Sequence, residues 1–360
     1  MSWPDLSNDV SKLIYDKLHH RLDRIRFSFV CKRWNTIHRE LNTRPFLMYY
    51  SSSSTDHHFT FRGPPLDRTF SRKIRVSADV IASKQGWLLI KDRENPLLYC
   101  CNPFTCNQIN LPKFDPGVNP NAVFTAPPSS RDCVLFVVGS TDVGSEFVTI
   151  NFIRCGDPYF SWKIFRVRNI SDAVSCKGLA YHEGKLYCFF DSGKLGIWKL
   201  INNDWTVVAS PLKPIPQTAA RMTTTSRIMT MVRSLGIQYD YLPPGPFKEY
   251  HMMNCEGDIL VLCTSKGFVP FSIFELDTKK MDWVNVTNLK HRAIFFNAGR
   301  NRCSSIAIRA DKLSLRNKIF YFYEHVGSYI WIYDLETRSH RLSDSYPDKL
   351  EDLQVWIDPI

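Results

Sequence analysis

A recurring pattern of strand, turn and strand restricts the fold more than any other feature of the sequence. The segments YCCNPFT, IFELDT and IYDLET each end on a threonine (Thr105, Thr278 and Thr337), and IWKLIN ends on Asn202. A further strand-like run follows each of them, and INFIRCGD around Cys155 is a weaker fifth copy. Short runs of β-branched and aromatic residues bounded by turn residues are typical of β-strands. Most of the chain is therefore expected to be β-sheet.

The spacing of these five positions predicts a β-propeller. They are separated by 50, 47, 76 and 59 residues, which is the range of four-stranded propeller blades. Upstream of each lies another strand-like run, such as GWLLI and GDILVLC. FLMYY (46–50), HFTF (58–61) and the C-terminal strand near LQVWI predict one more sheet, which closes the ring with strands from both ends. We expect a mainly β fold with six blades.

The 76-residue interval contains an insertion rich in proline, threonine and methionine. We expect it to form a long loop on one face of the propeller. Arg221, Arg227 and Arg233 lie in this insertion, and their guanidinium groups suit a carboxylate or a phosphorylated segment of a target protein. They are the candidate target-binding residues.

The first 41 residues have helical periodicity. Apolar residues at i, i+3, i+4 and i+8 within residues 8–20 predict a helix with one apolar stripe, and Ser7 is placed to cap its start. Ser11 falls on the polar side of that helix. Residues 22–41 keep helical spacing with a break near Val30 and Cys31, which predicts two further short helices. The stripe of the first helix consists of Val10, Leu13, Ile14 and Leu18.

Forty residues of this kind are too few to bury all of their apolar side chains by themselves. Some of these side chains are therefore expected to face another protein. A second interpretation is that they form the core of a helical extension packed against the β-rich body. Periodicity does not decide between the two.

The N-terminal segment also resembles a known family. WPDLSNDVSKLIYDKL followed by RIRFSFVCKRWNTI is similar to the F-box, the three-helix module that docks substrate receptors onto a SKP-family adaptor in cullin–RING ubiquitin ligases. Ser7 stands where the family usually has proline, which keeps a helix start but removes one apolar contact with the adaptor. The adaptor-binding residues that the resemblance implies are Leu6, Ser7, Val10, Ile14, Leu18, Val30, Cys31 and Trp34.

A second resemblance covers the body. GWLLI, NPFT, GDILVLC, FELDTKKMDWVNVTNL and the terminal VWIDP are similar to the KIB-like propeller that follows the F-box in a large plant family. Together the resemblances imply an F-box at 1–44 and a propeller at 45–360. They also imply a substrate-recognition subunit of an SCF-type E3 ligase, whose propeller binds an unknown target protein. Catalysis would then reside in other subunits.

Two other function classes remain open. The net charge is +11, and residues 290–318 hold eight basic residues against one acid, which fits an acidic partner such as nucleic acid. Because these positions are scattered and match no nucleic-acid motif, we interpret them as a solvated basic surface. A propeller hydrolase or oxidase is the third reading, but Asp277 and Asp334 lie beside turns, where acids usually bond to nearby backbone.

The remaining composition predicts no cofactor and no membrane span. Cysteines and histidines lack metal-site spacing, and DSGKLG lacks that of a phosphate-binding loop. The eleven cysteines fall mostly in apolar runs and read as reduced core residues, and no apolar leader opens the chain, so we expect a cytoplasmic or nuclear protein. Five tryptophans at comparable blade positions are expected to pack between blades: Trp162, Trp198, Trp205, Trp283 and Trp331.

Overall fold

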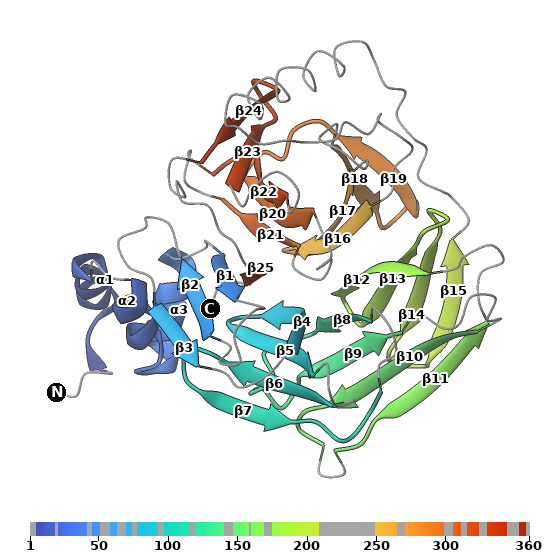
Figure 1. The fold of residues 1–360 in the computed structure, drawn as a ribbon, viewed down its shortest axis with the longest axis horizontal. Coiled ribbons are helices and arrows are strands. Elements are labelled where there is room, and N and C mark those ends of the chain that lie inside the picture. The colour runs from blue at the N-terminus through green and yellow to red at the C-terminus, as the bar shows by residue number, and fades with distance from the viewer. Residues whose placement is uncertain are drawn as a thin grey trace.

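The computed structural model consists of three helices followed by β-sheets that surround a common centre (Figure 1). The mainly β propeller fold expected from the sequence is confirmed. The residues that the structure describes are 5–18, 21–41, 45–50, 58–62, 70–73, 78–92, 97–115, 120–139, 147–157, 160–168, 175–208, 249–264, 271–298, 305–310, 315–323, 330–343 and 353–357.

The helices occupy the segment with helical periodicity. They are α1 (Asn8–Lys17), α2 (Arg21–Ser28) and α3 (Lys32–Leu41). Ser7 caps α1 as predicted, because its hydroxyl accepts a hydrogen bond from the Val10 amide at 3.4 Å. The chain turns at residues 29–31, where the second break was predicted.

Four sheets are formed by consecutive antiparallel strands. One contains β4 (Ala78–Lys84), β5 (Trp87–Asp92), β6 (Leu98–Asn102) and β7 (Asn107–Asn110). The next contains β8 (Asn121–Phe124), β9 (Val134–Val138), β10 (Phe147–Arg154) and β11 (Lys163–Arg168). The third contains β12 (Cys176–His182), β13 (Lys185–Phe190), β14 (Leu195–Lys199) and β15 (Asp204–Val208). The fourth contains β16 (Glu249–Cys255), β17 (Asp258–Thr264), β18 (Ser272–Asp277) and β19 (Asp282–Val286).

A fifth four-stranded sheet joins the two ends of the chain. It contains β1 (Phe46–Tyr50), β2 (His58–Arg62), β3 (Phe70–Lys73) and β25 (Leu353–Ile357), in the order β25-β1-β2-β3. Strand β25 pairs antiparallel with β1, with Trp356 opposite Leu47. This pairing confirms the prediction that strands from both ends close the ring. The helices lie outside the ring, on the side of β1–β3 (Figure 1).

The remaining sheet is irregular. It contains β20 (Arg292–Ala298), β21 (Ile306–Arg309), β22 (Lys318–Tyr323), β23 (Ile330–Asp334) and β24 (Ser339–Leu342). Its order is β21-β20-β22-β23-β24, and β20 runs parallel to β22. The regular four-stranded blades are therefore five rather than the six expected, because an additional strand, β20, enters this last sheet.

The five regularly spaced positions of the sequence repeat share one structural role. They are Thr105, Cys155, Asn202, Thr278 and Thr337. Each lies in the connection between the last two strands of its sheet. In three of these connections an Asn or Asp carboxamide or carboxylate oxygen accepts hydrogen bonds from backbone amides two and three residues later, at 3.0–3.3 Å. The acceptors are Asn102, Asp277 and Asp334. The expected structural role of the two acids is thereby confirmed.

The core lies between neighbouring sheets. Trp198 on β14 is fully buried and contacts the rings of Phe136, Phe152 and Phe165 on the preceding sheet at 5.3–5.7 Å between centroids. Trp331 on β23 is also fully buried, but it pairs with Leu342 and lies two residues earlier in its strand than Trp198 does in β14. Inter-blade packing is therefore confirmed for Trp198. The five tryptophans do not share one blade position as predicted, because Trp205 and Trp283 lie on the outer strands β15 and β19 and Trp162 precedes β11.

The described cysteines form no disulfide with one another. Most of them are buried, and burial raises the pKa of the Cys101 thiol to about 12, so the thiol stays protonated. Cys106 is exposed, which differs from the expected core role because it sits in the turn between β6 and β7. The insertion with Arg221, Arg227 and Arg233 lies outside the described residues.

Candidate functional site

The three helices, called here the helical module, enclose a small aromatic core. The rings of Phe27 and Trp34 stack at 4.1 Å between centroids, and Tyr15 meets Phe27 edge-on at 5.3 Å. The Tyr15 hydroxyl and His38 Nδ1 are 3.2 Å apart. Ile37 completes the buried cluster. This core cluster contains only four buried large residues, so much of the module's surface area remains accessible to solvent.

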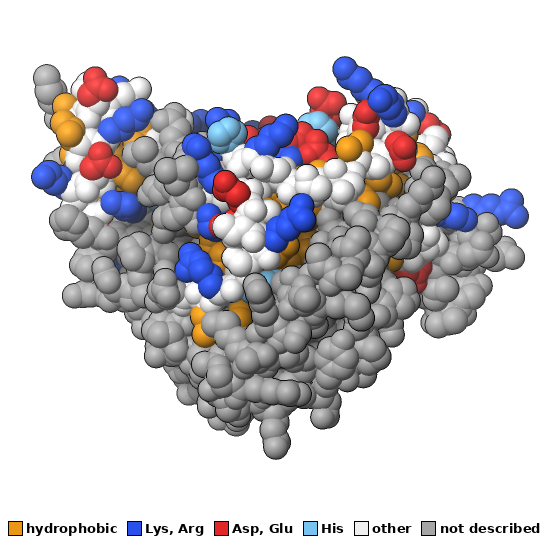
Figure 2. All heavy atoms as spheres, turned by 90° about the horizontal axis from the view of Figure 1, so that it is seen from above, with side chains coloured by type: hydrophobic (Ala, Val, Ile, Leu, Met, Phe, Trp, Pro, Cys, Tyr) orange, Lys and Arg blue, Asp and Glu red, His pale blue; other side chains and the backbone are white. Residues whose placement is uncertain are grey.

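Four large apolar side chains of the helical module remain exposed. Val10 is 42% exposed and Leu13 is 64% exposed on α1, whereas Phe29 at 44% and Val30 at 48% lie in the turn before α3. Over this part of the molecule, at the left of Figure 2, hydrophobic side chains reach the surface between charged ones. Scattered single apolar residues are normal on a protein surface, but four on so small a module are more than its own core covers.

A hydrogen bond relates the exposed residues to one another in space. Arg33 Nε, near the start of α3, donates to Asn8 Oδ1, at the start of α1, at 2.6 Å. The exposed turn that precedes α3 therefore lies at the end of the module where α1 begins. Arg24 stabilises the other end of α1 through two interactions. Its Nε donates to the Leu18 carbonyl at 2.7 Å, and its guanidinium lies 4.9 Å from the Tyr15 ring centroid.

The residues expected to contact an adaptor divide into three groups by their exposure. Val10 and Val30 are exposed and available for direct contact, as is the capping residue Ser7. Trp34 is buried in the module. The residues that pack against its core while remaining partly exposed are Leu6, Ile14, Leu18 and Cys31. The sequence interpretation omitted Leu13 and Phe29 from the contact set, although both lay in its apolar periodicity.

The predicted orientation of α1 was partly wrong. Ser11, placed on the polar side, is fully buried, whereas Leu13, placed in the apolar stripe, is largely exposed. The reason is Tyr15, whose ring enters the aromatic core and brings Ser11, one turn earlier, inside with it. The apolar stripe could not predict this orientation of α1, because tyrosine was not counted among its apolar positions.

A cavity of about 360 Å³ lies at the centre of the propeller. Residues of β4, β8, β12, β16 and β21 line it, including Lys84 and Lys177, together with Glu256 in the turn after β16. Its asparagines join neighbouring sheets: Asn121 Nδ2 donates to the Cys176 carbonyl at 2.9 Å, and Asn254 Nδ2 donates to the Tyr181 carbonyl at 2.7 Å. These amides hold the inner strands together, which is a structural role.

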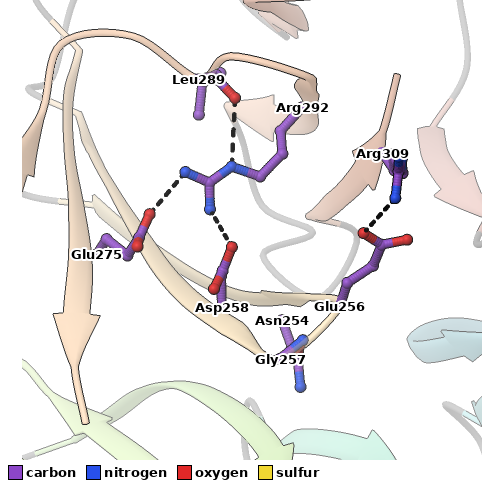
Figure 3. A network of polar contacts seen from close by, with 8 residues as sticks. All are labelled: Asn254, Glu256, Gly257, Asp258, Glu275, Leu289, Arg292 and Arg309. Atoms are coloured by element: carbon purple, nitrogen blue, oxygen red, sulfur yellow. Dashed lines mark hydrogen bonds and ion pairs between the residues drawn. The ribbon is translucent and has the colours of Figure 1, made fainter. Parts of the chain in front are cut away.

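The basic segment 290–318 is only in part the solvated surface that the sequence suggested, because Lys290 and Arg309 are exposed but Arg292 is not. Arg292 is only 13% exposed, and its guanidinium donates to Asp258 at 2.8 Å and to Glu275 at 2.7 Å (Figure 3). Both acids belong to the neighbouring sheet, so the ion pairs bridge two blades. Arg309 lies 3.7 Å from Glu256 across the same boundary (Figure 3). Some of the basic side chains in this segment therefore form ion pairs that join neighbouring blades.

Within the described ranges, no group of three His, Cys, Asp or Glu side chains is placed to hold a metal ion. None of the described helices is long and apolar enough to cross a membrane.

Curated relatives of this chain are plant F-box proteins. An F-box/kelch-repeat protein of Arabidopsis thaliana is 24% identical over 99% of this chain and 94% of its own length. An Arabidopsis F-box protein is 26% identical over 57% of this chain and 56% of its own, and a second F-box/kelch-repeat protein is 23% identical over 53% and 52%. The first alignment includes the helical module.

Solved structures resemble the chain only loosely. Hsv2 of Kluyveromyces lactis aligns over 86% of this chain and 81% of its own at 14% identity, with a TM-score of 0.34. That likeness is too low to support an argument about function.

The family model of the KIB1-4 beta-propeller matches residues 50–348. This range begins within β1 and ends after β24, so it contains nearly all of the sheets described above. The expected combination of a plant F-box protein with a KIB-like propeller is confirmed, and the chain belongs to the KIB1-4 beta-propeller family.

Proposed function

We propose that this protein is a substrate-recognition subunit of an SCF-type cullin–RING E3 ubiquitin ligase. The helical module binds a SKP-family adaptor, and the propeller binds a target protein. The chain itself is non-catalytic, since ubiquitin transfer belongs to other subunits. It acts in the cytoplasm or nucleus, with the F-box at residues 1–44 and the propeller at 45–360.

The observation that carries this proposal is the group of four exposed apolar side chains on the helical module. Val10, Leu13, Phe29 and Val30 surround a core too small to cover them, and the order of residues is that of an F-box. Burying such side chains against a partner stabilises the complex by roughly 25 cal/mol per Å² of apolar surface removed from water. Apolar residues that a partner covers make up the centre of a typical interface.

The roles of the predicted contact residues follow from their exposure. Val10, Val30 and Ser7 contact the adaptor directly, together with Leu13 and Phe29. Trp34, Ile14 and Leu18 act by holding the helices in the geometry that presents these contacts, and Leu6 and Cys31 lie at the margin of the core. Arg221, Arg227 and Arg233 remain the proposed target-binding residues.

The decisive experiment is co-expression of the full chain with a SKP-family adaptor, followed by affinity purification and size-exclusion chromatography. Leu13→Glu places a charge in the proposed interface and is expected to weaken adaptor binding at least tenfold, which is about 1.4 kcal/mol. A deletion of residues 1–44 is expected to abolish it.

Thr36→Glu is the matched control. Thr36 is exposed on α3, and the substitution adds the same single charge to a helix outside the apolar group. Adaptor binding should persist with this variant. If the wild-type chain is well folded and forms no complex, or if Leu13→Glu and Thr36→Glu bind equally well, the proposed docking surface is wrong.

A further inference from the structure

Strand β11 forms a free edge of its sheet. The sheet order is β11-β10-β9-β8, so among the described strands β11 pairs only with β10. Its six residues from Lys163 to Arg168 are all in register with β10, from Phe152 to Phe147. One row of backbone donors and acceptors on β11 therefore points away from the sheet, where another strand can pair with it.

One face of β11 is fixed by packing. Phe165 stacks on Phe152 with centroids 5.7 Å apart and lies 5.5 Å from Trp198, and Val167 packs against the same cluster. Because residues two apart in a strand share a face, these contacts fix which side chains point outward. The edge is thus a preformed template, which lowers the entropic cost of adding a strand.

The opposite face of β11 is basic and partly apolar. Ile164, Arg166 and Arg168 lie on it, and all three are exposed, with Ile164 at 58%. Lys163, on the packed face, is also exposed. Within the part of the chain that the structure describes, none of these three cations has an ion pair or a side-chain hydrogen bond. The edge therefore presents three positive charges without compensation.

This arrangement distinguishes β11 from the outer strands of the other sheets whose side chains are described. Strand β7 has no charged residue, β15 and β19 each begin with an aspartate and hold no cation, and β24 has Arg341 alone. Charges on an edge strand commonly prevent unwanted pairing. Here all charges have the same sign and are interspersed with apolar residues, so they disfavour basic strands and favour an acidic one.

We propose that the free edge of β11 binds an acidic, extended peptide segment of a partner protein by strand addition. The partner's backbone pairs with β11, its carboxylates meet Arg166 and Arg168, and its alternate apolar residues continue the face formed by Phe165 and Val167. Arginine suits this task because its guanidinium binds a carboxylate through two parallel hydrogen bonds. The site is separate from the helical module and does not depend on adaptor binding.

The test is fluorescence anisotropy with the full chain and a labelled peptide Glu-Val-Glu-Val-Val-Glu. Paired antiparallel with residues 168 to 163, this peptide places Glu opposite each of the three cations and Val opposite Val167, Phe165 and Ile164. We expect saturable binding that weakens as salt is added. A peptide with Lys in place of Glu should not bind, and one with N-methylated alternate amides should lose at least tenfold in affinity because pairing requires those amides.

The matching variants change charge at and away from the edge. Arg166→Glu with Arg168→Glu should weaken binding at least tenfold. Lys290→Glu with Arg338→Glu makes the same change in net charge at two exposed turn positions and should leave binding unchanged.

Three results would overturn the proposal. The first is no peptide binding up to about 1 mM, beyond which docking is too weak to be specific. The second is equal binding of the N-methylated peptide, which would show attraction of charge without strand pairing. The third is binding of oligodeoxythymidine at β11 in place of the peptide, which would assign the edge to nucleic acid.

Discussion

The helical module and the propeller differ in how completely they bury their large apolar side chains. In the propeller, large side chains such as Trp198, Trp331 and Trp356 are almost completely removed from water, because each sheet is covered by a neighbour and the ring is closed by β25. The helical module buries Tyr15 and Trp34 but leaves other large residues exposed. A closed ring supplies its own partner for every sheet face, whereas three short helices do not.

This difference indicates where each region can bind. The helical module offers apolar area, which suits a stable complex with a fixed partner. The propeller is several times larger and exposes large apolar residues only singly among its described strands and turns, such as Ile164 at 58% and Ile201 at 95%, so we expect it to bind through charges, strand edges and loops. This division is consistent with the proposed function, in which one region binds an adaptor and the other binds targets.

Trp34→Ala tests whether the helical module is held together by its small core. Truncating a buried aromatic typically costs about 3–5 kcal/mol, more than a module of this size can lose and stay folded. We expect the helical circular-dichroism signal and adaptor binding to disappear together while the main thermal transition of the propeller is unchanged.

Trp34→Phe is the milder control, because it keeps an aromatic ring against Phe27. It should retain adaptor binding. A Trp34→Ala variant with its helices intact would show that the module is stabilised by the propeller rather than by its own core.

Trp356→Ala tests the closure of the ring. Trp356 is buried, lies 5.0 Å from the Phe295 ring centroid and donates from Nε1 to the Phe296 carbonyl at 3.2 Å. Its truncation should lower the free energy of unfolding by about 3–5 kcal/mol, measured by urea denaturation, and should affect the whole propeller. The helical signal should persist. Loss of the helices in this variant would contradict the independence of the two regions.

The architecture could be predicted because it repeats. Turn residues such as Asn102 and Asp277 recur at the same point of successive hairpins, since each hairpin needs the same local hydrogen bonds. Ring closure by β25 also followed from strand patterns at both ends. The irregular sheet could not be predicted, because the parallel pairing of β20 with β22 depends on contacts between segments that no local pattern encodes.

The candidate site was only partly visible in the sequence. Periodicity identified α1 but gave its orientation incorrectly, because the position of Ser11 depends on how Tyr15 enters a core shared with α2 and α3. The use of Arg292 between blades was also hidden, since its acids lie 17 and 34 residues away. Both depend on tertiary contacts.

His340 provides a pH-dependent test confined to the propeller. Burial lowers the pKa of His340 to about 3, and its Nδ1 lies 2.8 Å from the Tyr321 hydroxyl. In the unfolded chain a histidine titrates near 6.5, so below that pH the unfolded state binds one more proton than the folded state. The free energy of unfolding should therefore fall by up to about 1.4 kcal/mol for each pH unit below 6.5.

His340→Gln should remove this contribution, so the difference between variant and wild type should change between pH 7 and about 5, before most carboxylates titrate. His291→Gln, at an exposed turn, is the control and should follow the wild type. Adaptor binding measured over the same range reports on the helical module. A parallel slope in wild type and His340→Gln would mean that His340 is not buried as described.

Arg292→Met gives the smallest expected effect and concerns the boundary between blades. The arginine is mostly buried, but Glu275 is 35% and Asp258 54% exposed, so solvent screens the ion pairs. We expect a loss of about 1–2 kcal/mol, between the values for exposed and buried pairs.

Lys199→Met is its matched control, because Lys199 pairs with Asp204 at 3.1 Å within one hairpin and both are about 40% exposed. That loss should stay below about 1 kcal/mol and vanish in high salt, whereas the Arg292 effect should persist. Equal losses in both variants would mean that the charges between blades are no more than surface pairs. Joining the sheets would then rest on the apolar core and the asparagine bonds around the central cavity alone.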